Sequence, residues 1–364
     1  MSITALLALM ASSGPAFAAD KPEITPTIQL QVWTTVWDQD EDETADPAGY
    51  GDPEHDPGFT IRRGRAGLAA VYGPIDAFVE IGVGAPSDAL IATDTDVRIQ
   101  NAHIRGSQKL GPGTGRISAG LIKVPFSREA IMSSRDLTFQ DRAVHTGWMA
   151  PIQDLGVLAD WEADFGLRVQ AGVFNGGGNI FSDDGSGLLY GGRLEYSKGD
   201  TYVTSGPADP VAFGAGISAY FDDDIATQTF AFEGDFLLRA WRFHATGEYA
   251  QAMISPGDST VDLPDVLTKT TRRGISGQIG YTQPLGQGGL EIATRIGTFD
   301  DATSLQNNGD VAIIHAGATW RDLVPTLDLG VGFIHREELQ GRKIANDTIR
   351  IWTQFAWPAR HPKK

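Results

Sequence analysis

The segment at residues 126–150 combines basic side chains with apolar ones at close spacing. Arg128, Arg135, Arg142 and His145 give it a positive potential, which attracts anions and partly replaces their hydration. Its apolar residues recur every few positions: Phe126, Ile131, Met132, Leu137, Phe139 and Trp148. Such residues need a surface to bury against. We therefore expect this segment to pack against the protein interior, and the alternative is an external cap with solvated charges.

A second charged segment, residues 38–56, has nine acids and no Lys or Arg. The D-x-D-x-D spacing of Asp38, Asp40 and Asp42 is able to bring carboxylates around Ca²⁺. The EF-hand pattern fails, because the positions for its Gly and Glu hold other residues. Two interpretations stay open: a solvated loop, or a divalent-cation site that bridges lipopolysaccharide phosphates.

No group of residues indicates catalysis. The sequence lacks G-x-S-x-G and H-E-x-x-H, and its seven His residues are scattered. His244 and Glu248 have the spacing of one strand face, where a polar pair lining a lumen is the more ordinary arrangement. Ser133 and Ser134 beside Arg135 are an equally weak signal. We assign no catalytic residue and predict that the protein is not an enzyme.

The composition excludes further classes. The 364 residues include no Cys, which excludes disulfides, thiolate metal sites and a Cys nucleophile. A net charge of −17 argues against nucleic acid as a partner, and 41% hydrophobic residues indicate an ordered protein. Residues 1–18 have the short apolar core and final A-x-A of a secretory signal peptide, although no Lys or Arg precedes the core.

The elements that must position these residues are strands. After residue 20 the chain has no apolar run long enough for a transmembrane helix. It shows alternation instead: in 165–174, Leu167 and Val169 point one way while Arg168 and Gln170 point the other. About sixteen such segments follow one another, near 27–38, 58–73, 74–85, 95–109, 113–125, 151–162, 165–175, 187–198, 209–221, 226–239, 240–254, 271–283, 288–299, 309–321, 325–336 and 347–357.

The connections and aromatic residues favour a membrane sheet over a soluble β-sandwich, propeller or lectin. Short connections alternate with long ones, as in outer-membrane barrels, although 199–208 is too long for this rule and suggests a misplaced strand boundary. Trp357 ends the last amphipathic strand, as the terminal aromatic residue of such barrels does. Aromatic residues near strand ends are suited to interfacial girdles: Trp33, Trp37, Tyr72, Trp161, Tyr220, Trp241, Tyr249, Tyr281 and Trp320.

We therefore predict an all-β protein, a transmembrane antiparallel β-barrel of about 16 strands with an inward-folded constriction loop. The barrel is expected to occupy residues 19–357, with 38–57 as an acidic external loop and 358–364 as a C-terminal tail. Side chains cannot fill so wide a barrel, so it leaves an aqueous channel unless a segment plugs it. The longest connection, 126–150, is the candidate constriction.

Two motifs carry a resemblance to a known family. The run Gly120-Leu-Ile-Lys-Val-Pro-Phe-Ser-Arg-Glu129, followed by Leu137-Thr-Phe-Gln-Asp-Arg142, resembles the strand and constriction loop of the phosphate-selective porins O and P. Upstream, Phe59-Thr-Ile-Arg-Arg-Gly-Arg65 resembles a strand of the same family. The resemblance implies trimeric sixteen-stranded channels in which arginines guide anions to a constriction that contains lysines.

Carried over onto this sequence, the resemblance implies pore and anion-binding roles for Arg62, Arg63, Arg65, Lys123, Arg128, Arg135 and Arg142. Guanidinium groups hold phosphate oxygens in a bidentate fork. Two features depart from the family. Lys123 is the only lysine in 110–197, and acidic residues between the loop arginines leave 121–150 with a formal charge of only +1.

The function predicted is an outer-membrane porin for passive diffusion of small anions such as phosphate. The alternatives are a general diffusion porin without phosphate selectivity and a plugged barrel that binds a surface. The expected partners are small anions, outer-membrane lipid and lipopolysaccharide, and two further copies in a homotrimer. The expected location is the outer membrane of a Gram-negative bacterium. No cofactor is expected, apart from the candidate Ca²⁺ at Asp38, Asp40 and Asp42.

Overall fold

The computed structural model describes residues 21–38, 57–83, 97–176, 187–204, 208–224, 227–257, 269–306, 309–341, 343 and 345–358. The predicted signal peptide, nearly all of the acidic segment and the end of the C-terminal tail lie outside these residues. No helix in the described part of the chain is long and apolar enough to span a membrane.

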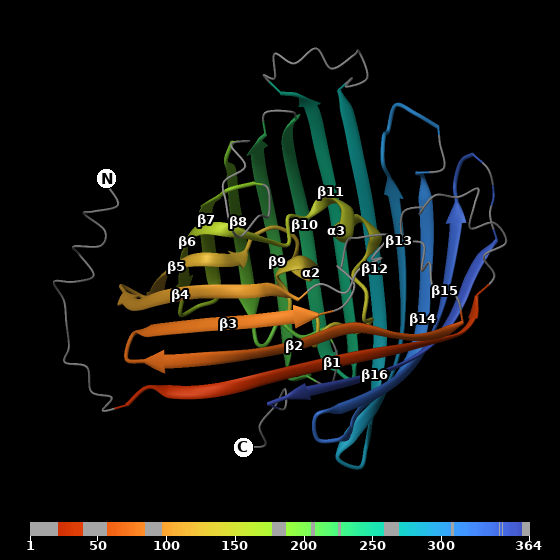
Figure 1. The fold of residues 1–364 in the computed structure, drawn as a ribbon, viewed down its shortest axis with the longest axis horizontal. Helices are drawn as coiled ribbons and strands as arrows, with labels where there is room; N and C mark the ends of the chain where they lie inside the picture. Colours follow the sequence, from red (N-terminus) through yellow and green to blue (C-terminus); the bar gives the residue numbers. More distant parts are fainter. Residues whose placement is uncertain are drawn as a thin grey trace.

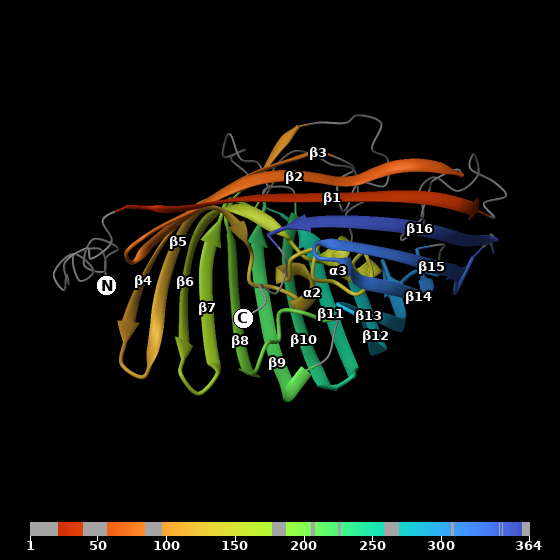
Figure 2. The ribbon, with the colours of Figure 1, turned by 90° about the horizontal axis from the view of Figure 1, so that it is seen from below.

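The described chain forms sixteen strands in one closed sheet (Figures 1 and 2). Each strand pairs antiparallel with its neighbours in sequence, and β16 pairs with β1 to close the barrel. This confirms the sixteen-stranded antiparallel barrel predicted from alternation. The strands are β1 Glu23–Asp38, β2 Gly58–Tyr72, β3 Ile75–Val83, β4 Arg98–Leu110, β5 Gly113–Lys123, β6 Gln153–Ala163, β7 Leu167–Phe174, β8 Leu189–Lys198, β9 Ala208–Asp223, β10 Thr227–Trp241, β11 Phe243–Pro256, β12 Thr270–Leu285, β13 Gly288–Asp300, β14 Val311–Val324, β15 Leu327–Glu338 and β16 Asn346–Trp357.

The two faces of the sheet differ as the alternation predicts. On β12, Ile275 and Ile279 are more than half exposed, whereas Gln278 between them is buried. On β13, Ile292 is exposed and Glu291 is buried. Apolar side chains therefore cover the outside of the barrel, and polar ones face its interior.

Two residues assigned to the outer aromatic girdle face inward instead. Trp33 is 4% exposed and shares the inner face of β1 with Gln31. Tyr220 is 7% exposed, and its hydroxyl donates to the carbonyl oxygen of Met149 at 2.9 Å. Aromatic character and position near a strand end do not decide whether a side chain points into or out of the barrel. Strand parity, meaning the alternation of successive side chains between the two faces, decides it.

The hydrophobic core lies inside the barrel, between the wall and the segment that joins β5 to β6. Phe126 packs edge-on against Tyr220, with ring centroids 4.8 Å apart. The buried cluster around them includes Val124, Met149, Phe174, Leu189 and Phe299. This cluster attaches the β5–β6 segment to strands β7 to β11, β13 and β14.

Candidate functional site

The segment between β5 and β6 crosses the interior of the barrel. It contains two short helices, α2 Arg128–Ile131 and α3 Val144–Met149, which lie inside the ring of strands (Figures 1 and 2). Wall side chains hold its backbone from separate sides. Arg63 of β2 donates to the carbonyl oxygen of Gln140, and on the far side of the barrel Glu248 of β11 accepts from the N–H of Glu129. Gln354 of β16 adds a hydrogen bond to the carbonyl oxygen of Arg135. Because these and other contacts come from strands around the closed sheet, the segment lies in the lumen.

The start of this segment is held by Glu248 on β11. Ser127 has a left-handed backbone, with a φ of 60°, and its hydroxyl donates to Glu248 at 2.7 Å. The other oxygen of Glu248 accepts from the backbone N–H of Glu129 at 2.6 Å. The same Ser127 hydroxyl accepts from the N–H of Ala130 and so caps α2. His244 shares the inner face of β11 with Glu248, as expected, and lies 3.5 Å from Glu291.

Arg128 lies in a buried network of charges on β8 and β10. Its guanidinium is 2.7 Å from Asp235 and 3.3 Å from Glu195. Arg193 is bonded to the same two carboxylates, at 2.6 and 3.0 Å. Because Arg128 is only 1% exposed and its charge is matched, it attaches the lumen segment to the wall.

Wall arginines on β13 and β14 hold the middle of the segment. Arg295 is 2.8 Å from the carboxylate of Glu129, and it also donates to the carbonyl oxygens of Asp141 and Arg142. Arg321 donates to the carbonyl oxygens of Leu137 and Thr138 while pairing with Glu291 and Asp328. Thus much of the positive charge on this wall is used to hold backbone oxygens.

A β-bulge explains how Arg62 and Arg63 both point inward although they are adjacent. The register of β1 with β2 shifts between Gln31 and Val32, which pair with Arg63 and Ile61, so Arg62 is the extra residue. Arg62 is 3.1 Å from Asp141, and Arg63 donates to Gln31 at 2.7 Å. Both arginines are buried in these contacts.

Asp141 offsets part of the positive charge of the arginines that converge on it. Arg350 of β16 is 3.5 Å from its carboxylate, and both Arg350 and Arg62 lie over the ring of Trp33. Burial alone would raise the pKa of Asp141, but Arg62, Arg350 and Arg63 outweigh it and lower the pKa to about 2. Asp141 therefore carries a full negative charge at neutral pH.

The remaining lumen beside β2 to β7 contains a cavity of about 430 Å³. Its charged lining is one-sided, with six basic residues, one acidic residue and one histidine. These are Arg65, Arg105, Lys123, Arg135, Arg142 and Arg168, with Glu80 and His103. Polar groups that complete the lining include Gln100, Asn101, Ser118, Ser133, Ser134, Gln153 and Tyr202.

Four of the seven predicted anion-binding residues line this cavity: Arg65, Lys123, Arg135 and Arg142. Arg62 and Arg63 do not line it, because Asp141 and the carbonyl oxygen of Gln140 in the lumen segment hold them elsewhere. Arg128 does not line it either, because it is held by Asp235 of the wall. The predicted set therefore divides into a group around the cavity and a group that fixes the segment.

Lys123 and Arg142 bind main-chain oxygens near the start of the lumen segment. The ammonium group of Lys123 donates to the carbonyl oxygens of Ile131 and Met132 at 2.9 and 2.5 Å. Arg142 donates to the carbonyl oxygens of Glu129 and Met132 at 3.0 and 3.3 Å. Carbonyl oxygens carry only partial charges, so the positive potential of both groups extends into the cavity.

The other lining cations are nearer to carboxylates. Arg65 is 3.8 Å from Glu80 and donates to the hydroxyl of Ser134. Arg135 is 3.7 Å from Asp136, and Arg105 is 3.9 Å from Asp76. These three contacts are 3.7–3.9 Å long, so neutralisation is partial. Arg168 differs, because it donates to the buried Asp160 at 2.6 Å and its charge is closely matched.

The connection between β8 and β9 supplies a residue that sequence reasoning missed. The predicted strand boundary is correct, because β8 ends at Lys198 and β9 begins at Ala208. The described part of the connection, residues 199–204, contacts the lumen. Thr201 is 2% exposed, and its carbonyl oxygen accepts from Arg128. Tyr202 lines the cavity and accepts from Arg168 at 2.7 Å. The unusual length of this connection was the available signal.

Arg105, His103, Gln100 and Asn101 were also missed. Arg105 lies beside the exposed Ile104 on β4, so strand parity alone could have placed it in the lumen. Gln100 is the extra residue of a second register shift, between β3 and β4, which parity does not reveal.

The structure adds little to the predicted Ca²⁺ ligands. Asp38 accepts a hydrogen bond from Thr348 of β16 at 3.1 Å. Asp40 and Asp42 lie outside the described residues, so a cation site there stays a prediction.

A closed sixteen-stranded antiparallel sheet, apolar outside and polar inside, defines the class of outer-membrane porins. Solved porins and channels share the fold at low sequence identity. OmpT of Vibrio cholerae, in a trimer form, is 13% identical with a TM-score of 0.58, covering 93% of this chain and 100% of its own. An anion-selective porin from Comamonas acidovorans is 12% identical with a TM-score of 0.58 and the same coverage. The outer membrane channel DcaP of Acinetobacter baumannii is 12% identical with a TM-score of 0.57, covering 93% and 97%.

The similarity in sequence covers less of the chain than the similarity in fold does. Residues 82–255 match the family model of the phosphate-selective porins O and P, which confirms the predicted resemblance. The matched region contains the Gly120–Arg142 motifs and every strand from β4 to β10. No curated protein sequence matches the chain. Residues 82–255 are thus similar to this family, and the fold is that of outer-membrane porins, which are typically channels rather than enzymes.

Proposed function

We propose that the barrel conducts small anions, phosphate included, by passive diffusion past the cavity beside β2 to β7. The observation that carries this proposal is the charge of the lining, with six basic residues against one acidic residue. A water-filled passage with such a lining concentrates anions and repels cations. This local excess occurs in a chain whose overall charge is −17.

Phosphate is supported by the types of donor around the cavity. Arg65, Arg142 and Arg168 offer planar guanidinium groups, and Lys123 adds a compact ammonium. Guanidinium forks match the spacing of phosphate oxygens, which a spherical chloride ion cannot use in the same way. The hydroxyl groups of Ser133 and Ser134 are further potential donors.

A general diffusion porin is the second candidate, and the nearby carboxylates favour it. Asp76, Asp136 and Asp160 each pair with an arginine of the lining. A passage with part of its charge balanced in this way would prefer anions weakly and would not distinguish phosphate from chloride.

Bilayer measurements on the purified protein separate these functions. We expect discrete conductance steps, a reversal potential of anionic sign in a KCl gradient, and inhibition of chloride current by millimolar phosphate. Anionic selectivity without phosphate inhibition would leave the general porin. A cationic reversal potential would contradict the anion pathway, and the absence of steps would favour a plugged barrel that binds a surface.

We further propose that the protein is a homotrimer in the outer membrane of a Gram-negative bacterium, in contact with lipid and lipopolysaccharide. The fold and the trimer form of the OmpT relative support this assembly. Light scattering of the detergent-solubilised protein, corrected for bound detergent, tests it, and a mass equal to one chain would oppose it.

A further inference from the structure

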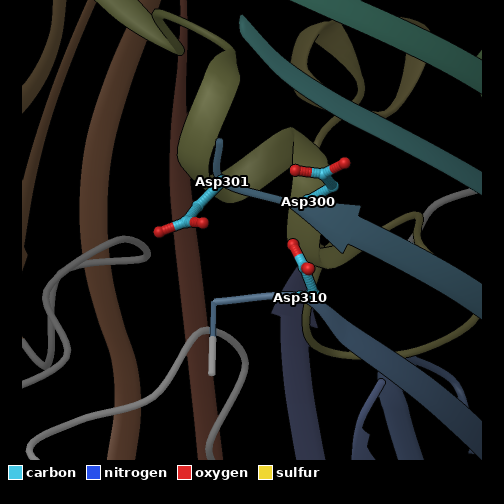
Figure 3. A group of neighbouring side chains, drawn as sticks. All are labelled: Asp300, Asp301 and Asp310. Atoms are coloured by element: carbon cyan, nitrogen blue, oxygen red, sulfur yellow. The ribbon is translucent and has the colours of Figure 1, made fainter. Parts of the chain in front are cut away.

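Three carboxylates meet at the end of the barrel opposite the chain termini. Asp300 ends β13, Asp301 follows it, and Asp310 directly precedes β14. One oxygen from each carboxylate can be chosen so that all three lie within 4.8 Å of one another. Figure 3 shows the carboxylate of Asp310 pointing toward Asp300.

Two of these carboxylates contain a buried oxygen that no donor satisfies. Asp310 is 5% exposed, and its Oδ1 atom has no hydrogen-bond partner among the described residues. The same is true of Oδ1 of Asp301. A buried carboxylate oxygen without a donor is costly, and two of them beside a third acid indicate that a positive partner belongs there.

The neighbouring protein groups only partly supply that positive charge. Oδ1 of Asp300 accepts from the backbone N–H of Ala302 at 3.1 Å. Arg273 is 4.0 Å from Oδ2 of Asp300, but its side chain is 52% exposed, so solvent screens the interaction. Neither contact reaches the orphan oxygens of Asp301 and Asp310.

The backbone around the cluster is held in place. The N–H of Leu339 donates to the carbonyl oxygen of Asp310, and the N–H of Thr303 donates to that of Thr271 on β12. The carboxylate of Asp301 lies against the backbone of Gly309, where a Cβ atom would be 2.2 Å from its carboxyl carbon. Gly309 therefore leaves room for the position that Asp301 adopts.

We propose that Asp300, Asp301 and Asp310 form a Ca²⁺ site in the β13–β14 connection. Calcium prefers oxygen ligands at about 2.3–2.6 Å, so oxygens on opposite sides of the ion lie about 4.6–5.2 Å apart. Three oxygens within 4.8 Å of one another fit around such an ion, and water or backbone oxygens would complete its coordination. The bound ion neutralises the crowded acids and ties the strands β13 and β14 together.

This site shares no residue with the acidic segment at 38–56 or with the lining of the anion cavity. Conductance measurements therefore test the anion pathway independently. Measurements of cation binding test the Ca²⁺ site.

Calorimetric titration of the chelator-treated protein with CaCl₂ tests the proposal. The reference protein carries Asp40→Asn and Asp42→Asn, which removes two of the three candidate ligands in the acidic segment, and the loss caused by Asp310→Asn is measured against it. We expect one Ca²⁺ per chain, and Asp310→Asn is expected to weaken its binding at least about tenfold because an anionic ligand is lost. No Ca²⁺ binding by the reference protein, or equal affinity after Asp310→Asn, would overturn the proposal.

Gly309→Ala provides a variant that keeps every charge. Its methyl group displaces the Asp301 carboxylate, so we expect weaker Ca²⁺ binding with an unchanged CD spectrum. Gly277→Ala on β12 is a control, since a Cβ atom there meets no other atom within 4 Å and its φ is not positive, so its Ca²⁺ affinity should equal that of the parent. Unchanged affinity in Gly309→Ala, or binding of Mg²⁺ in preference to Ca²⁺, would contradict the site as assigned.

Discussion

The two walls of the lumen carry similar side chains but use them differently. On β8, β10, β13 and β14, arginines and acids are paired in buried networks with the lumen segment, and Arg128 is the clearest case. On β2 to β7, cations surround a cavity with few acids. The difference follows from where the segment packs. Its contacts occupy the arginines of β13 and β14 and also Arg62 and Arg63 on β2, whereas the other cations of β2 to β7 lie beside the cavity.

The net charge of a segment does not identify an ion pathway. The segment at 121–150 has a formal charge of only +1, yet its cations are distributed unequally. Arg128 faces Asp235, whereas Lys123 and Arg142 face the cavity and bind carbonyl oxygens. Function therefore depends on which acids lie beside which cations.

Arg128→Ala should produce the largest effect, because it breaks the paired wall. It leaves Asp235 and Glu195 with less compensation in a buried site, which costs about 3–5 kcal/mol when one partner of such a pair is removed. We expect a lower melting temperature and a larger, noisier single-channel conductance as the segment loosens. Thermal melts and bilayer recordings check this. A variant with the parent's stability and conductance would show that the segment is held by other contacts.

Lys123→Gln should have an intermediate effect, confined to selectivity. Glutamine retains a donor for the carbonyl oxygens of Ile131 and Met132 but removes the charge. One unit charge about 4–8 Å from a permeating ion contributes about 0.5–1 kcal/mol in a hydrated passage. Its loss therefore lowers the anion-to-cation permeability ratio roughly two- to fivefold. Reversal potentials in a KCl gradient measure the ratio.

Lys109→Gln is the matched control for this experiment. Lys109 pairs with Asp164, and its side chain is 59% exposed and does not line the cavity. Its substitution should leave selectivity unchanged. Equal shifts in both variants would mean that total charge, rather than the cavity, sets the preference.

Arg135→Ala should reduce anion preference less than Lys123→Gln does. Arg135 lies 3.7 Å from Asp136 and its side chain is one-third exposed, so part of its charge is already screened. We expect a change of less than about twofold in the permeability ratio. A larger change than that of Lys123→Gln would mean that Arg135, rather than Lys123, sets the anion preference of the passage.

The alternation of side chains along each strand predicted most of the fold and part of the site. Alternation located all sixteen strands and placed Arg168 on the inner face, because side-chain direction in a strand is a local property. It failed at Arg62, whose inward direction depends on a bulge. It could not anticipate the burial of Arg128 either, since Glu195 and Asp235 lie 67 and 107 residues away in sequence.

The weakest test of the comparison is the response of Asp141 to pH. Its folded pKa of about 2 lies below the ordinary value of 3.8, because Arg62, Arg350 and Arg63 outweigh the effect of burial. Its contribution to stability is therefore complete above the ordinary value and is lost as pH falls through about 2. We expect Asp141→Asn to lower the melting temperature by a constant amount from pH 7 to pH 5, and the difference should shrink from pH 4 toward pH 2. A difference that vanished already at pH 5 would mean that the arginines of β2 and β16 do not hold this carboxylate, and that the charge on this part of the wall is available to the passage as well.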